Sequence, residues 1–534
     1  MQRLTQLAGG LSSPAILIVV IWSVALLSVA FGPIDYPGQP SVVVMAVVAA
    51  GLLLFLLGYQ GGTLLFDRRF ARQFEVSPLS AKTLDSVVVA TSLLGITGIA
   101  LVALDRTVLS GVSNGSYAEL LRCAPALVDV IVIKRTPLLY GGYALFSFGF
   151  ISVVLFLLKG EEISGWPAVL AQLSIVSPVG YALLYAGRMP ILFMLVLIVA
   201  AILIRLGQGR APLPRGHHLL FKSFVAVALF GVYSSAIWSS RQNFCTQMTP
   251  LIRQLQEEKA ARDLAGRDPL VRPPVVREQL DREASTDRRP AVAEAAVPQV
   301  NEMIEATDLS KRLTEARTGT TVEQKPATHD QVLASMLEAW DVRPRGYVMS
   351  AIESGYLRPR IGLTVFSTSF YFTHGVRTID MVWKARDKFT PQWGVYEIGV
   401  LSPLLRQFLP SNRQLATMEA EQKAAEIYGF FPTVWVAAFI DFGIVGAVIY
   451  ILIWGGIGGW CAAGSRHSGL MTPLLLQVFV LGSILLSPVQ APLGAANSAL
   501  VLGSMLMVGL FMDAYSIRSG RSVKETYEES LRTG

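Results

Sequence analysis

The stretch PTVWVAAFIDFGIVGAVIYILIWGGI, residues 432–457, carries a single charged side chain, Asp441. A helix of about 20 apolar residues is long enough to cross the ~30 Å hydrocarbon core of a bilayer. Lipid offers no hydrogen-bond partners to a backbone, so a segment that spans it alone must be a helix. The stretch therefore predicts a transmembrane helix.

Similar apolar runs recur along the chain. Hydrophobic residues make up 52% of the sequence and charged residues 16%, against about a quarter charged in soluble proteins. We therefore predict an all-α polytopic membrane protein with about ten transmembrane helices and a large extracytoplasmic loop between the seventh and eighth. The other predicted spans are 14–31, 41–57, 87–104, 138–158, 166–185, 190–204, 219–238, 472–486 and 495–512.

The first run has two interpretations. Arg3, the apolar stretch and the triplet Ser28-Val29-Ala30 resemble a secretory signal with its cleavage site. The stretch is longer than the usual apolar region of such signals. We expect it to be retained as the first span.

The distribution of Lys and Arg over the short loops indicates an orientation, because these residues are enriched on the cytoplasmic side. With a cytoplasmic N-terminus, loops 32–40 and 487–497 lie outside without any Lys or Arg. Loop 105–137 departs from the pattern with Arg106, Arg122, Lys134 and Arg135. We predict both termini in the cytoplasm and the large loop in the periplasm, in a bacterial inner membrane. The cytoplasmic side then holds Arg68, Arg69, Arg72, Lys82, Arg205, Arg210, Arg215, Arg466, Arg518, Arg521 and Lys524.

Composition divides the chain into four regions. Residues 1–240 form a membrane domain of seven spans, and residues 432–534 form the last three spans and a cytoplasmic tail. Between them, residues 241–345 form a charged insert in which 254–331 has no Phe, Trp or Tyr. Such a composition cannot bury a core and is typical of disorder. Residues 346–431 form an aromatic and arginine-rich periplasmic loop at the membrane surface.

The aromatic loop has two interpretations. Its Trp, Tyr and Phe residues alternate with cations that include Arg358, Arg360 and Arg377. Aromatic and basic residues together form interface belts in many membrane proteins. They also suit sugar rings and diphosphate, which aromatic faces and guanidinium groups bind. Segment 362–373 is too short to span and is predicted as re-entrant, interfacial or buried; 400–409 has the spacing of a helix on the outer leaflet.

Other residue types exclude several functions. The chain has no CxxC or HExxH pattern, and five histidines do not suggest a metal site, so we expect no metal or other cofactor. Cys123 and Cys245 both lie on the predicted outer side, where they either form a disulfide or remain free thiols. Cys461 is expected to pack in a span. The net charge of +7 follows the topology, and no nucleic-acid partner is expected.

Short motifs resemble those of one family. Gly187-Arg188-Met189-Pro190, Gly429-Phe430-Phe431-Pro432-Thr433 and the run from Phe439 to Gly446 look like the Wzy-type O-antigen and oligosaccharide-repeat-unit polymerases. The resemblance implies glycosyl transfer between repeat units linked to undecaprenyl diphosphate, without a metal. It implies lipid-linked oligosaccharides and membrane lipids as partners, with a chain-length regulator and a flippase as further partners. O-antigen ligases share the same plan.

Candidate site residues follow from this resemblance and from the residues themselves. Arg188, Arg358, Arg360 and Arg377 are candidates for binding diphosphate, His374 for the base, and Asp441 for orienting an arginine or acting on the acceptor. The alternatives are a snorkelling Arg188, a surface His374 and an Asp441 paired structurally between helices. A transporter or a non-catalytic scaffold remains open, although charged residues near mid-membrane, usual in coupled transporters, are rare here.

Overall fold

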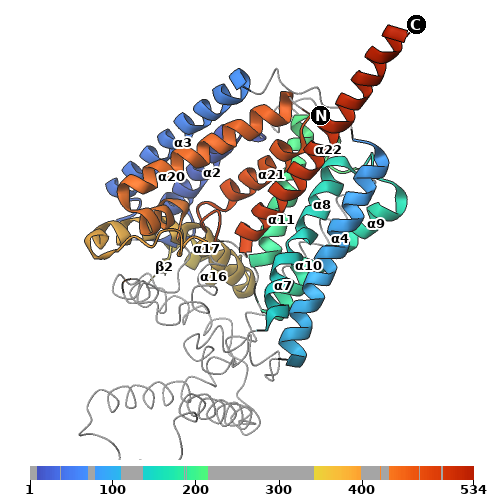
Figure 1. Cartoon of the computed structure of the whole chain (residues 1–534). Coiled ribbons are helices and arrows are strands. Elements are labelled where there is room, and N and C mark those ends of the chain that lie inside the picture. The colour runs from blue at the N-terminus through green and yellow to red at the C-terminus, as the bar shows by residue number, and fades with distance from the viewer. Residues whose placement is uncertain are drawn as a thin grey trace, which may run out of the picture.

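The computed structural model describes residues 9–36, 38–69, 79–109, 136–185, 187, 189–214, 342–398, 421, 432–467, 469–494 and 497–533. These residues are almost entirely helical (Figure 1). The helices are α2 (Pro14–Phe31), α3 (Val42–Arg69), α4 (Ala81–Leu104), α7 (Pro137–Phe146), α8 (Phe148–Lys159), α9 (Gly165–Leu173), α10 (Val176–Leu184), α11 (Met189–Gly207), α16 (Gly346–Glu353), α17 (Pro359–Lys384), α20 (Val434–His467), α21 (Met471–Leu486) and α22 (Ser498–Thr533).

The chain is an all-α polytopic membrane protein. Within the described residues, eight helical segments are long and apolar enough to cross a membrane. Two of them consist of paired helices, α7 with α8 and α9 with α10, and α21 is a shorter apolar helix. The predicted span 219–238 lies outside the described residues, as do nearly all of the charged insert, segment 400–409, Cys123 and Cys245.

Several helices extend beyond the predicted apolar runs. Helix α3 continues to Arg69 and α4 begins at Ala81, where Ser80 accepts a hydrogen bond from the Thr83 N–H. A polar cap supplies the acceptor that the first turn of a helix lacks. Hydropathy detects only the part of a helix that lies in lipid, so the runs at 41–57 and 87–104 were too short.

The two ends of the helix bundle differ. Helices α16 and α17 and strand β2 (Arg343–Pro344) lie at one end, and the chain termini lie at the other (Figure 1). Strand β2 pairs antiparallel with β1 (Ile34–Asp35), which directly follows α2. We call these the loop end and the terminal end.

Helix α2 is an integral part of the bundle. Trp22 is fully buried, its indole N–H donates to the Ser487 hydroxyl at 2.9 Å, and its ring lies 5.2 Å from that of Trp435. These contacts join α2 to α20 and to the loop that follows α21.

Segment 362–373 is part of α17, a helix of 26 residues that packs on α2, α3 and α20. Phe366 and Phe370 are buried on its inner face. Tyr36 and Thr373 share a hydrogen bond of 2.9 Å, and Ser41 donates to Asp380 at 3.0 Å. These two hydrogen bonds join α17 to the connection between α2 and α3 and so fix the position of α17 at the loop end.

Candidate functional site

The polar centre of the loop end is built on a break in helix α20. Gly443 has φ 64° and ψ −171°, a backbone region open essentially to glycine alone. The break leaves backbone groups that need new partners. The carbonyls of Ile440 and Asp441 accept hydrogen bonds from the N–H groups of Gln392 (3.2 Å) and Trp393 (2.8 Å). The turn of residues 391–398 therefore docks directly on the break.

Asp441 completes this docking. One carboxylate oxygen accepts the N–H of Tyr396 at 3.0 Å and the other accepts that of Glu397 at 2.7 Å. The side chain is fully buried. Buried carboxylates are tolerated where hydrogen bonds satisfy their oxygens. Asp441 thus holds the turn in place, and through the turn it positions Glu397.

Glu397 is a buried carboxyl group that sequence analysis missed. Its Oε1 accepts a hydrogen bond from the Tyr450 hydroxyl and another from the Leu493 N–H at 3.4 Å. Burial raises the pKa of Glu397 from its ordinary 4.5 to about 7; the Tyr450 bond opposes this shift and the charge of Asp441 adds to it. A carboxyl group with a pKa near the working pH suits general acid–base chemistry.

Among the predicted residues, α17 brings His374 and Arg377 together. His374 is buried, and its ring stacks on Phe370 at 4.6 Å. Burial, with the charge of Arg377, lowers the pKa of His374 to about 3, so its imidazole is neutral at physiological pH. A group with so low a pKa is a weaker base than Glu397 at neutral pH.

Two of the predicted arginines in the described part of the chain, Arg360 and Arg377, lie far apart along α17. Arg358 is exposed and immediately precedes α17, and Arg360 lies in its first turn. At ~1.5 Å per residue, about 26 Å of helix separates Arg360 from Arg377. One phosphate group cannot contact both. Arg188 lies outside the described residues.

A second polar cluster surrounds Arg106. A π-helical turn, Asp105–Leu109, follows α4, and Arg106 is only 3% exposed. Its Nε–H donates to the Tyr185 hydroxyl at 3.1 Å, and its guanidinium carbon lies 5.8 Å from the centre of that ring. Asp105 is 3.8 Å away and accepts a hydrogen bond from Thr136. Single π turns are frequent at functional sites.

The loop between α21 and α22 contacts both clusters. Leu493 in this loop donates to Glu397, and Asn497 at its end donates to the Tyr181 hydroxyl at 2.8 Å. The ring of Tyr181 lies 4.7 Å from that of Tyr185. From sequence, Arg106 counted only as an exception to the charge rule. Its position directly after a span, beside Asp105, was the available signal.

The buried charges of the terminal end have structural roles. Arg205 donates to the carbonyls of Leu157 (2.8 Å) and Ala211 (2.7 Å) and pairs with Glu161. The carbonyl of Leu157 belongs to the last turn of α8, where a cation is favoured. In the described part of the chain, no group of three or more His, Cys, Asp or Glu residues could hold a metal ion.

The fold defines a helical membrane protein. Its two buried polar clusters, one around Asp441 and Glu397 and one around Arg106, lie at the loop end. Compared with known proteins, the chain matches no family model, no curated protein and no solved structure.

Proposed function

We propose that this protein polymerises oligosaccharide repeat units linked to undecaprenyl diphosphate into a surface polysaccharide, by glycosyl transfer at the periplasmic face of a bacterial inner membrane. One observation carries the proposal. Glu397, a carboxyl group with a pKa of about 7, is held at the loop end, the face that the charge distribution assigns to the periplasm. The motif resemblance around Arg188 and Asp441 supplies the substrate class.

The proposed chemistry needs few groups. A hydroxyl of the acceptor repeat unit attacks the anomeric carbon of the donor glycan, and the bond from that carbon to the diphosphate oxygen breaks. Glu397 takes the proton of the attacking hydroxyl, and Asp441 fixes the turn that carries Glu397. Lipid diphosphate leaves with its own negative charge, which cations of the loop end stabilise. Beyond this, the enzyme has to hold the acceptor hydroxyl close to the anomeric carbon of the donor.

A coupled transporter is the second candidate. Helix α20 is interrupted at Gly443, beside the buried carboxylates of Asp441 and Glu397. Transporters often build ion and substrate sites from interrupted helices. This function requires an ion gradient, whereas glycosyl transfer from a lipid diphosphate does not.

Reconstitution separates the two functions. The purified chain is placed in vesicles with a lipid-linked repeat unit and no ion gradient, and products are resolved by size. We expect a ladder of glycans, and about 100-fold slower formation with Glu397→Gln, since a general base contributes about 10²–10⁴-fold. Glu162→Gln, the same change at the terminal end, is the control. Absence of a ladder with the unaltered chain would refute the polymerase, and gradient-dependent solute uptake would favour the transporter.

A further inference from the structure

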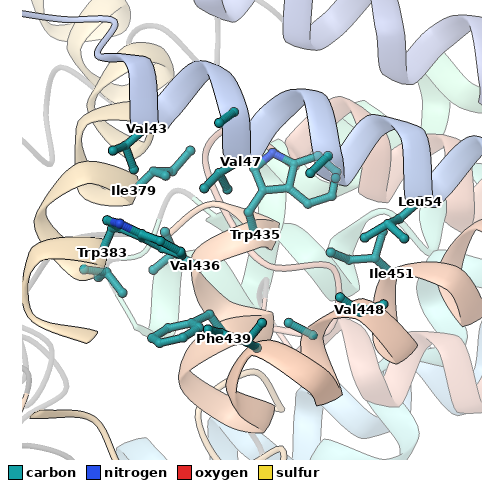
Figure 2. A pocket seen from close by; sticks show the side chains of 16 residues that line it. Val43, Val47, Leu54, Ile379, Trp383, Trp435, Val436, Phe439, Val448 and Ile451 are labelled. Atoms are coloured by element: carbon teal, nitrogen blue, oxygen red, sulfur yellow. The ribbon is translucent and has the colours of Figure 1, made fainter. Parts of the chain in front are cut away.

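An apolar groove lies between α3, α17 and α20. Its volume is about 380 Å³, within the range of small-molecule sites. Figure 2 shows the rings of Trp435, Trp383 and Phe439 around it, with Val47 on α3 and Ile379 on α17. All sixteen lining residues are apolar or aromatic, so the groove suits a hydrocarbon.

The break in α20 helps to form the groove. Val436 and Phe439 line it from the segment before Gly443, and Ile444 and Ile451 line it from the segment after. On the facing helix, Gly51 makes room for Trp435: a Cβ there would lie 2.9 Å from the indole ring. The groove is thus shaped by the same break that holds Asp441 and the turn of residues 391–398.

One side of the groove is open. Ala46 and Ala50 on α3 are exposed, and Ile444 is 56% exposed. The adjoining surface is apolar as well, with Val445 at 74% and Met45 at 47% exposed. These residues belong to membrane-spanning helices. A hydrocarbon chain can therefore enter sideways from the bilayer.

The rim at the loop end is cationic. Three cations, Lys384, Arg386 and Lys388, follow Trp383, against the two carboxylates Asp380 and Asp387. Lys384 pairs with Asp380 at 2.7 Å yet is 75% exposed, and the guanidinium of Arg386 lies 5.4 Å from the centre of the Trp383 ring. An anionic headgroup above an apolar chain matches this charge pattern.

We propose that the groove holds the polyprenyl chain of the lipid-linked substrate, with the carrier's phosphates at Lys384 and Arg386. The inference rests on the proposed function and adds to it the place of the lipid. Phe439 lines the groove two residues before Asp441, and its ring lies 6.4 Å from that of Phe389, just ahead of the turn that carries Glu397. A lipid bound here has its headgroup beside the candidate site. An ordinary phospholipid, which takes no part in the proposed reaction, would not need to bind next to Asp441 and Glu397.

The test uses a photoreactive polyprenyl diphosphate and the full-length chain in nanodiscs. We expect labelling of peptides from α3, α17 and α20 and competition by unlabelled polyprenyl diphosphate. Ala50→Trp fills the groove and should reduce labelling about tenfold, which equals a loss of about 1.4 kcal/mol in binding. Ala49→Trp is the matched control, because Ala49 is also exposed on α3 but does not line the groove.

The outcomes separate the two proposals. Equal labelling of Ala50→Trp and Ala49→Trp, or competition by phosphatidylglycerol as effective as by polyprenyl diphosphate, overturns the groove assignment even if the protein forms a glycan ladder. Selective loss of labelling in Ala50→Trp supports the groove, even if the unaltered chain forms no ladder and the polymerase proposal fails.

Discussion

Helices α3 and α20 pack against each other in two different ways. Toward the terminal end, glycines bring the two backbones into contact: a Cβ on Gly62 would lie 1.9 Å from the Gly456 carbonyl oxygen, and one on Gly459 would lie 1.9 Å from that of Tyr59. Toward the loop end, α20 breaks at Gly443 and the helices separate around the apolar groove. Close packing excludes a ligand from one half, and the break makes room for one in the other.

Two carboxylates extend the comparison. Asp513 at the terminal end accepts the N–H groups of Met471 (2.6 Å) and Thr472 (3.0 Å) at the start of α21. Asp441 at the loop end accepts two N–H groups of the turn of residues 391–398. Both satisfy backbone donors, but only Asp441 holds a segment that carries another buried acid, Glu397. We therefore expect both residues to contribute to stability and only Asp441 to affect the proposed activity.

The largest effect is expected from Gly62→Val. The new side chain cannot fit against the α20 backbone, and overpacking of this kind costs about 3 kcal/mol or more. We expect little folded protein, measured as the monodisperse fraction in size-exclusion chromatography. Gly61→Val is the control, since a Cβ at Gly61 has nothing within 4 Å. Equal yields of the two variants would contradict the close-packed interface.

Asp441→Ala should be the next most damaging change. It leaves two buried N–H groups without acceptors, at about 1–3 kcal/mol each. Asp513→Ala removes an equivalent pair, so both variants should show lowered thermal midpoints. At matched amounts of folded protein, only Asp441→Ala should lose glycan formation. Similar specific activities in the two variants would confine Asp441 to a structural role.

Glu397→Gln should change the pH dependence of stability. Because the folded pKa of Glu397 is about 7 and its ordinary value is 4.5, the folded state binds more protons than the unfolded state between these pH values. Stability contributed by the protonated group is therefore lost as pH rises through this window, by at most about 3 kcal/mol. Glu397→Gln should therefore be more stable than the unaltered chain at pH 8, and the difference in stability should disappear near pH 4.5. Parallel melting curves across this range would contradict the buried, protonated carboxyl.

Gly443→Ala should have the smallest effect. An alanine at φ 64° and ψ −171° is strained by about 1–3 kcal/mol. We expect a modest drop in thermal midpoint together with weaker labelling by the polyprenyl probe, because the strained segment shapes the groove wall. Unchanged stability and unchanged labelling in this variant would show that the shape of the groove does not depend on the break at Gly443.

The spans were predictable because each depends on a local property, a run of apolar residues. Residues 14–31 were placed at the bounds that α2 has. The interruptions were not predictable: Ser147, between α7 and α8, bonds to the Ser504 hydroxyl at 2.7 Å, and such a partner is known only from the fold. Of helix α17, only segment 362–373 was singled out, as re-entrant, interfacial or buried, since the polar residues around it keep the hydropathy of the whole helix low.

The site was only partly predictable, for a related reason. Asp441 was visible because a charge inside an apolar run is rare. Glu397 looked ordinary, since its burial comes from the broken helix and from the loop that contains Leu493. Arg106 was visible as a charge, but its partner Tyr185 directly follows α10, and the Tyr185 hydroxyl in turn bonds to Tyr143 of α7. Burial by distant segments is what a single sequence conceals.

The most direct test of the polymerase proposal is the surface-glycan profile of a host that lacks this gene, resolved by size on a gel. We predict that the ladder disappears while single repeat units remain attached to their acceptor, and that the unaltered gene restores it. Polymer left on the lipid carrier without attachment would indicate a ligase. An unchanged ladder would contradict the account and leave the transporter as the better explanation of the broken helix.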